Sequence, residues 1–252
     1  MKQLIIANWK MNPQTLAEAK RLFDSVKRGL KNIKNVEVVI CPPFVWLPYL
    51  INPIPHTLDL KFGAQNCFWE NLGPFTGEIS PLMLKNLGYR YVILGHSDRE
   101  RYLSETDEMT NKKIKAAISA KLNPILCIGE IEKKRGEIPQ VLKHQLEKTL
   151  INLLPNQLIN LIIAYEPVWA VGTGKPCYPQ DAGKRISIIR KIISNLYNLS
   201  FSQKIKIIYG GSVNSKIAQD YVKKANFQGL LVGGASLKAQ EFIEIAKKVS
   251  QT

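Results

Sequence analysis

The sequence alternates short apolar runs with amphipathic stretches along its whole length. The apolar runs are Leu4–Trp9, Val36–Cys41, Leu58–Gln65, Tyr89–Leu94, Asn123–Ile128, Leu158–Tyr165, Lys204–Tyr209 and Gln228–Val232. The stretches with helical spacing or a helix-start signal are Leu16–Leu30, Phe44–Leu50, Ser80–Leu87, Pro139–Leu153, Pro179–Leu196, 215–224, Leu237–Val249, and one capped by Ser104 or Thr106 that runs to Ala120. Strict alternation of strand and helix predicts a parallel sheet. About eight such units predict an α/β protein with a single (β/α)8 barrel domain over residues 1–252.

Composition excludes several classes of protein. The 252-residue chain is 45% apolar, which suits a sizeable core, and no apolar run approaches the 18 residues of a membrane span. The N-terminal MKQLIIANWKMN lacks a signal-peptide pattern, so we expect a cytoplasmic protein. The four cysteines, Cys41, Cys67, Cys127 and Cys177, are far apart and lack nearby histidines. We therefore expect buried thiols, with no disulfide and no metal site.

The net charge of +15 allows two interpretations. A functional one is nucleic-acid binding, or electrostatic steering of an anionic substrate. The other is compositional drift toward lysine on the surface. Lysines are scattered along the predicted helices, and no block of five like charges occurs. We favour drift, with steering as a by-product, and expect neither a nucleic-acid nor a membrane partner.

The stretch Ala164–Lys175, AYEPVWAVGTGK, carries the strongest functional signal. Glu166 ends a predicted barrel strand, which is where such barrels place catalytic residues. The following loop to Pro179 is long, and its apolar residues 168–171 indicate a lid that closes on something. Gly172 and Gly174 allow backbone N–H groups to approach an anion. The segment predicts a catalytic base beneath an anion-binding lid.

Other polar and glycine residues also follow directly after predicted strands. They are Asn8, Lys10, Gln65, Asn66, His96, Ser97, Glu130, Ser212, Gly233 and Gly234. The carboxyl ends of parallel barrel strands meet at one mouth, so we expect these residues to converge.

Each candidate also has a structural interpretation. Lys10 could be a solvated lysine, and Glu166 could cap a helix or pair with a surface lysine. The apolar neighbours of Glu166 would instead make it a stronger base. Among the three histidines, we interpret His144 as solvated, His56 as structural and His96 as functional.

The glycine-rich loops indicate a phosphate ester as the ligand. Residues 172–175 read GTGK, but Trp169 and Pro176 break the phosphate-loop pattern of nucleotide triphosphatases. What remains is GGS at 210–212 and GG at 233–234, after the last two predicted strands. Loops in these positions commonly bind phosphate in such barrels.

Seven motifs together resemble the triosephosphate isomerase family over essentially the whole chain. They are ANWKMN (7–12), AQN with GPFTGEIS (64–66 and 73–80), LGHSDRE (94–100), CIGE (127–130), AYEPVWAVGTGK (164–175), YGGSV (209–213) and LVGGASL (231–237). The resemblance implies cofactor-free interconversion of dihydroxyacetone phosphate and D-glyceraldehyde 3-phosphate, a step of glycolysis and gluconeogenesis.

The resemblance also implies roles for individual residues. Glu166 would be the base, His96 a neutral hydrogen-bond donor, Lys10 a positive charge beside the substrate and Asn8 a polar anchor. Gly172, Ser212, Gly233 and Gly234 would hold the phosphate through backbone N–H groups, with Asp98, Cys127 and Tyr209 in support. Family members are homodimers, which makes Phe75 and Thr76 the residues expected to insert toward a second subunit. A tetramer remains an alternative.

The chain departs from the family pattern at three places. Asp98 replaces the usual Glu, Glu100 replaces the usual Arg, and Pro176-Cys177 replaces small residues after the lid. Because Asp98 is one methylene shorter, we expect weaker contacts with Lys10 and around His96, and an active but slower enzyme. Cys177 still offers a backbone N–H, so we expect it to keep a hydrogen bond to Tyr209.

Two other functions are weaker candidates. Another sugar-phosphate barrel enzyme, such as a pentulose-phosphate epimerase, commonly brings metal-binding His and Asp residues to the mouth. This chain has one histidine at a predicted strand end. A basic nucleic-acid-binding protein would bind random DNA with a steep salt dependence. An inactive structural barrel would not need the trio Lys10, His96 and Glu166.

Pro176 is predicted to stiffen the end of the lid, because proline fixes its own φ. Replacing it with Val or Thr should alter the rate of lid exchange measured by NMR relaxation dispersion. Exchange rates identical to those of the original chain would rule out stiffening by Pro176.

Overall fold

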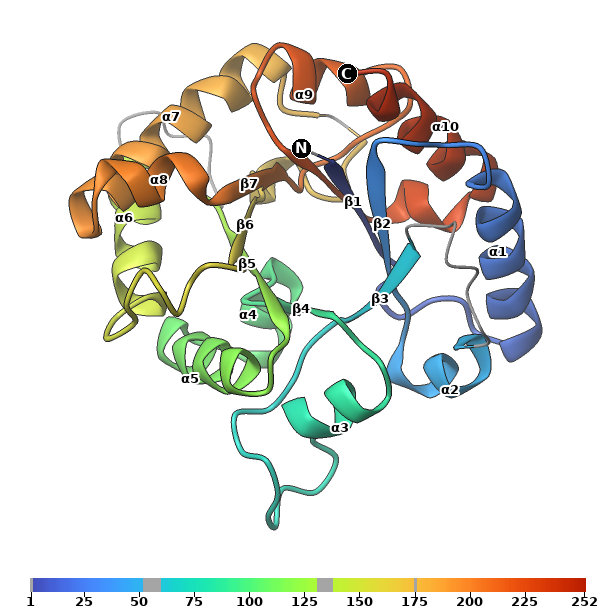
Figure 1. Cartoon of the computed structure of the whole chain (residues 1–252), viewed down its shortest axis with the longest axis horizontal. Helices are drawn as coiled ribbons and strands as arrows, with labels where there is room; N and C mark the ends of the chain where they lie inside the picture. The colour runs from blue at the N-terminus through green and yellow to red at the C-terminus, as the bar shows by residue number, and fades with distance from the viewer. Residues whose placement is uncertain (1, 52–59, 131–137, 175) are drawn as a thin grey trace.

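The computed structural model shows a closed barrel of eight parallel strands, as the alternation predicts. It describes residues 2–51, 60–130, 138–174 and 176–252. The strands are β1 Gln3–Asn8, β2 Val36–Cys41, β3 Leu60–Ala64, β4 Tyr91–Leu94, β5 Asn123–Ile128, β6 Ile162–Tyr165, β7 Lys206–Tyr209 and β8 Gly229–Val232. They surround the centre of the molecule, with the helices outside them (Figure 1).

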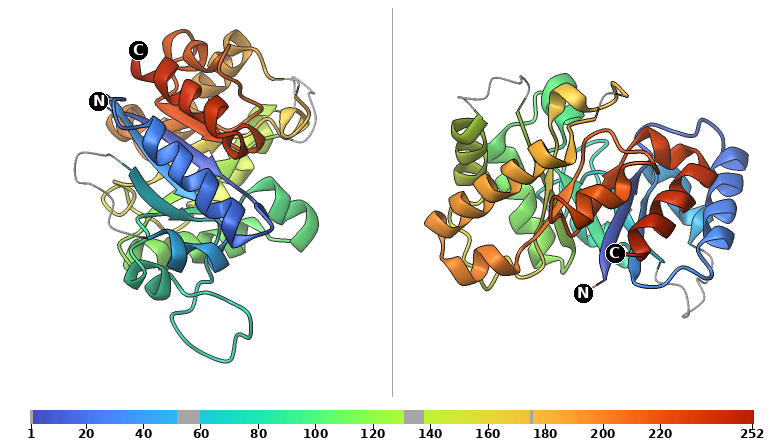
Figure 2. Two further views of the ribbon diagram at one scale, coloured as in Figure 1. Left: turned by 90° about the vertical axis from the view of Figure 1, so that its right-hand side faces the viewer. Right: turned by 90° about the horizontal axis from the view of Figure 1, so that it is seen from above.

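Closure is visible in the register of the first strand. Ile5 of β1 pairs with Val38 of β2 on one side and with Leu230 of β8 on the other. Because every strand has two neighbours, the described sheet has no free edge. All carboxyl ends of the strands therefore face one mouth. In the right-hand view of Figure 2 both chain termini lie at the opposite, lower end of the barrel.

Side chains alternate between two buried layers along each strand. One layer fills the barrel interior: Leu4, Ile6, Val39, Cys41, Tyr91, Ile93, Ile125, Cys127, Ile162, Ala164, Ile208 and Leu231. The other layer faces the helices and forms the larger core, for example Ile5, Val38 and Leu230. Burying a Val, Leu or Ile side chain contributes about 1.5–3 kcal/mol relative to leaving it exposed. The two layers account for the nearly continuous apolar strands of the sequence.

The helical elements follow the strands around the barrel. They are α1 Leu16–Gly29, η1 Phe44–Trp46, α2 Leu47–Leu50, α3 Pro81–Asn86, α4 Ser97–Leu103, α5 Asp107–Ser119, α6 Ile138–Thr149, η2 Val168–Ala170, α7 Pro179–Leu196, α8 Leu199–Lys204, α9 Ala218–Lys223, η3 Gly234–Leu237 and α10 Ala239–Ser250. Ser80 caps α3 ahead of Pro81, as predicted. Of the two alternatives for α5, Thr106 is the cap, and its hydroxyl accepts from the Met109 N–H.

The structure differs from the sequence predictions at three places. No helix was predicted directly after His96, but α4 begins at Ser97 with His96 as its N-cap. The helix α8 was not anticipated, because six residues are too few to show a period. Strand β6 begins at Ile162 rather than Leu158, since the N–H groups of Leu158 and Leu161 bond to nearby carbonyls in turns. The prediction for His56 and the expected start of β3 at residues 58–59 lie outside the described residues.

Two expectations drawn from the composition concern the four cysteines and a membrane-spanning helix. All four cysteines are free and buried. Within the described ranges, no helix has the length and apolar character needed to span a bilayer.

A buried charge cluster ties the loop after β4 to α5 and to β3. The Glu105 carboxylate forms ion pairs with Arg99 and, at 2.6 Å, with the Lys113 ammonium. Lys113 also donates to the Asn66 side-chain oxygen at 2.9 Å, and the Gly95 N–H donates to Glu105. The cluster thus holds the backbone directly before His96. Burial alone would raise the pKa of Glu105, but its bonds to Lys113 and Arg99 lower it below the ordinary value.

Replacing Glu105 with Gln should destabilise the fold by about 3 kcal/mol or more, because Lys113 would remain buried without its carboxylate. The lowered pKa means that the charged form stabilises the native state above the ordinary carboxyl pKa. That contribution is lost as pH falls through the lower native pKa. Urea unfolding from pH 7 to pH 3 should therefore show a smaller acid-dependent loss in Glu105→Gln. The exposed Glu244→Gln is the matched control, and equal stabilities would contradict the role of the cluster.

Candidate active site

A cavity of about 310 Å³ opens at the carboxyl ends of the strands. Its lining brings together eight of the residues that the sequence singled out: Asn8, Lys10, His96, Glu166, Gly172, Ser212, Gly233 and Gly234. These residues come from both ends of the chain and from the middle. The predicted convergence of strand ends on one mouth is therefore present.

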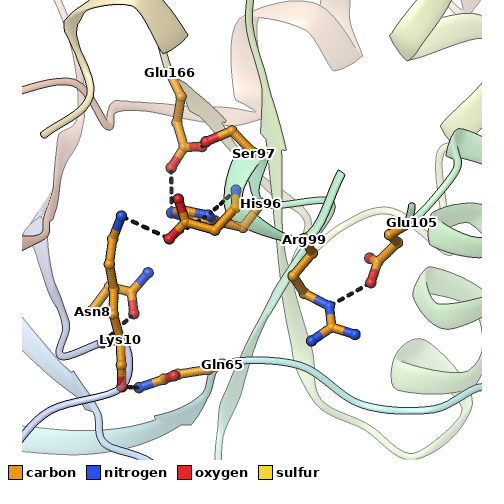
Figure 3. Close-up of polar contacts among 9 residues, drawn as sticks. Asn8, Lys10, Gln65, His96, Ser97, Arg99, Glu105 and Glu166 are labelled. Atoms are coloured by element: carbon orange, nitrogen blue, oxygen red, sulfur yellow. Dashed lines mark hydrogen bonds and ion pairs between the residues drawn. The ribbon is translucent and has the colours of Figure 1, made fainter. Parts of the chain in front are cut away.

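Glu166 lies at the base of this cavity, directly after β6. Its side chain is 2% exposed. One carboxylate oxygen lies 3.4 Å from Nε2 of His96, and the other accepts a hydrogen bond of 3.4 Å from the Ser97 hydroxyl (Figure 3). Glycines on both sides make room for it. A Cβ on Gly129 would lie 1.7 Å from the Glu166 carbonyl oxygen, and one on Gly210 would lie 2.7 Å from its Cγ.

His96 is held in one tautomer by the helix that it caps. Its Nδ1 accepts the Asp98 N–H at 3.0 Å, so this nitrogen carries no proton. In the neutral ring the proton then sits on Nε2. Nε2 is the nitrogen that faces Glu166 and the cavity. The imidazole is thus a hydrogen-bond donor toward anything bound there.

Lys10 adopts a left-handed backbone conformation with φ 52°, which is strained for a residue with a side chain. Two partners hold it there. Its N–H donates to the Asn8 side chain at 3.0 Å, and its carbonyl accepts from Gln65 at 2.8 Å. Gln65 donates as well to the carbonyl of Cys41 at 2.9 Å. In this conformation Lys10 lines the cavity.

Asp98 reaches Lys10 in spite of its shorter side chain. The carboxylate lies 2.8 Å from the Lys10 ammonium and 3.7 Å from Nδ1 of His96. The expectation that the contact with Lys10 is weakened was wrong, because α4 begins at Ser97 and brings residue 98 close to the mouth. Partial burial alone would raise the pKa of Asp98, but the bond to Lys10 and the charges around it lower the pKa.

The loops after β7 and β8 provide the third wall of the cavity. Ser212 follows β7, and Gly233 and Gly234 lead from β8 into the short helix η3. Backbone N–H groups at the start of such a helix, together with adjacent glycine-rich loops, suit an anion. From the lid, Gly172 lies opposite with φ 73°, a left-handed conformation that favours glycine.

The N-terminal side of the lid is anchored away from the cavity. The Trp169 indole N–H donates to the Glu130 carboxylate at 3.1 Å, and the Tyr165 hydroxyl donates to it at 2.8 Å. Glu130 was predicted to converge on the mouth with the other polar residues. It does not line the cavity, because its side chain points beneath the lid to these partners.

Cys127 and Tyr209, which were expected to support the site, lie outside the cavity and contact the residues around it. Cys127 is buried beside Glu166. Burial, and then the charge of Glu166, raise the pKa of the Cys127 thiol, so it stays protonated. Tyr209 accepts the Cys177 N–H at 3.2 Å, the hydrogen bond expected from the sequence.

Three residues with a contact in the site were noticed in the sequence but given no role: Gln65, Ser97 and Glu130. Their position after strands was a usable signal, but their partners are 55, 69 and 39 residues away.

Phe75 and Thr76 lie outside the cavity, on the exposed loop between β3 and α3 that extends from the barrel in Figure 1. Among the described residues, no group of three or more His, Cys, Asp and Glu could hold a metal ion.

A parallel barrel with a buried carboxylate, a neutral imidazole, a lysine and glycine-rich loops at its mouth defines a (β/α)8 enzyme for proton transfer on a small anion. A family model described as Triosephosphate isomerase matches residues 3–249. A triosephosphate isomerase of Dehalococcoides mccartyi is 47% identical over 99% of this chain and 98% of its own length. One of Dictyoglomus turgidum is 45% identical, over 98% and 99%. The chain belongs to the triosephosphate isomerase family.

The Lys10–Asp98 contact predicts the effect of replacing Asp98 with the glutamate that is usual in the family. Because Asp98 already pairs with Lys10 and is half-exposed, Asp98→Glu should change kcat by less than about fivefold, the value of an ion pair worth about 1 kcal/mol. Steady-state kinetics of both proteins checks this. A larger increase in kcat would show that the missing methylene limits the enzyme.

Proposed function

We propose that this chain is a triosephosphate isomerase, which interconverts dihydroxyacetone phosphate and D-glyceraldehyde 3-phosphate without a metal or organic cofactor. The observation that carries the proposal is the buried Glu166 carboxylate, 3.4 Å from the protonated nitrogen of a neutral His96, in a cavity lined by phosphate-type loops. The family, and relatives with this name at up to 47% identity over nearly the whole chain, support the same activity.

In this proposal Glu166 is the general base. It removes a proton from the substrate carbon beside the carbonyl, and the electron pair moves to the carbonyl oxygen as an enediolate forms. The protonated Glu166 then returns a proton to the neighbouring carbon, which completes the exchange of aldehyde and ketone. A positioned base of this kind contributes typically ~10²–10⁴ in rate.

His96 and Lys10 stabilise the charge that develops on the substrate oxygens. His96 donates its Nε2–H, since Nδ1 is occupied by the Asp98 N–H. Lys10 supplies a positive charge near both the enediolate and the phosphate, and Asn8 contributes a polar anchor. Donors that are already oriented in a site that excludes water cost no reorganisation during the reaction.

Binding of the substrate's phosphate group explains the glycine loops and the lid. Backbone N–H groups of Gly172, Ser212, Gly233 and Gly234 bind the phosphate, so that substrate binding draws the lid toward the loops after β7 and β8. A closed lid excludes water from the enediolate. This matters chemically, because an enediolate that reopens to solvent can expel its neighbouring phosphate.

We propose further that the chain is cytoplasmic and forms a homodimer through the loop between β3 and α3. Phe75 is 39% exposed although it packs on Phe68 at 4.7 Å between ring centroids. Thr76 and the residues around it are exposed as well. An exposed loop with an aromatic tip suits insertion into a neighbouring subunit.

Replacing Glu166 with Ala should lower kcat for glyceraldehyde 3-phosphate by at least about 10²-fold, because the variant lacks the base. A coupled assay that measures dihydroxyacetone phosphate is the readout. Glu147→Ala, on the outer face of α6, is the control and should retain full activity. Absence of activity in the original chain, or full activity in Glu166→Ala, would exclude this function.

A further inference from the structure

Cys177, the residue at the C-terminal end of the lid, is held through both groups of its backbone. It is 3% exposed. Its N–H donates to the Tyr209 hydroxyl at 3.2 Å, and its carbonyl accepts from the Tyr221 hydroxyl at 2.5 Å. Tyr221 belongs to α9 and had no role in the sequence analysis. The lid thus ends in a position fixed from β7 and from α9 together.

The two tyrosines form one unit. Their rings stack with centroids 3.9 Å apart and planes 13° from parallel. Their hydroxyls hold opposite sides of the same residue, since Tyr209 accepts the Cys177 N–H and Tyr221 donates to the Cys177 carbonyl. The stacked pair therefore fixes the direction of the backbone at Cys177.

This tyrosine pair is closely packed and lies next to the site. Both tyrosines are fully buried, and Phe227 packs edge-on against them at 5.6 and 6.4 Å. Gly211, which lines the cavity, lies against the Tyr209 hydroxyl, since a Cβ there would be 2.2 Å from its oxygen. The same Cβ would be 3.1 Å from Pro167, at the other end of the lid. The tyrosine pair therefore contacts the loop after β7 and lies near both ends of the lid.

We propose that Tyr221 is a positioning residue for the isomerisation: its hydroxyl holds the Cys177 carbonyl and thereby fixes the direction in which the lid lies over the cavity. The inference rests on the proposed function for its kinetic consequences. Tyr221 does not contact the cavity, so it acts through Cys177 and the lid. Losing its hydroxyl frees the carbonyl side of the hinge while Tyr209 still holds the N–H side.

The chemistry of the intermediate supplies a specific readout. In a poorly closed site the enediolate electrons expel phosphate as the C–O bond breaks, and the resulting enol rearranges to 2-oxopropanal. No oxidant or reductant is needed. The fraction of turnovers that end in 2-oxopropanal and inorganic phosphate therefore measures lid closure, whereas a general loss of stability leaves this fraction unchanged.

The test is Tyr221→Phe, which removes one oxygen and keeps the stacked ring. We expect a several-fold rise in the fraction of turnovers that release phosphate, with a smaller change in KM. The matched control is Tyr197→Phe, whose hydroxyl donates to the Leu150 carbonyl at 3.1 Å, in a loop that does not line the cavity. An unchanged fraction in Tyr221→Phe, or an equal rise in Tyr197→Phe, overturns the proposal.

Hydrogen exchange tests the role of Tyr221 independently of activity. The buried Cys177 amide, which is bonded to Tyr209, should exchange faster in Tyr221→Phe than in the original chain, because the freed carbonyl side loosens the hinge. Equal exchange rates in the two proteins would contradict a hinge fixed by Tyr221. A chain without isomerase activity would overturn the proposed function, while this exchange measurement would still decide the role of Tyr221 at the hinge.

Discussion

Closure of the parallel barrel is the constraint on which the site depends. Pairing of β1 with both β2 and β8 forces residues from both ends of the chain to the same mouth. Asn8 and Lys10 thereby lie in one cavity with Gly233 and Gly234, although the two pairs are more than two hundred positions apart. In an open sheet, β1 and β8 could lie at opposite edges, and Lys10 and the glycine loop after β8 would not line one cavity.

Close packing of backbone against Glu166 is the second requirement. Gly129 and Gly210 come from different strand ends, and a Cβ on either would collide with Glu166. They leave the carboxylate buried, with the Ser97 hydroxyl as a hydrogen-bond donor. The Lys10 ammonium pairs instead with Asp98 at the wall of the cavity.

The lid is fixed by polar contacts at both ends, and its middle is open around the glycines. Glu130 holds Tyr165 and Trp169 at the start, and the hydroxyls of Tyr209 and Tyr221 hold Cys177 at the end. Between them, a Cβ on Gly172 or Gly174 would meet no atom within 4 Å. Such an arrangement suits a lid that moves as one piece about two anchored ends.

The sequence by itself determined the barrel, because an apolar run and a helical period are local properties that survive without knowledge of contacts. It also determined the residues of the cavity, since strand ends in a parallel barrel share one mouth. Only the tertiary structure decided how these residues are held. His96 caps the helix α4, Gln65 supports the strained Lys10, and Tyr221 holds Cys177. Those contacts join positions up to 55 residues apart or elements too short to show a period, and so no local pattern records them.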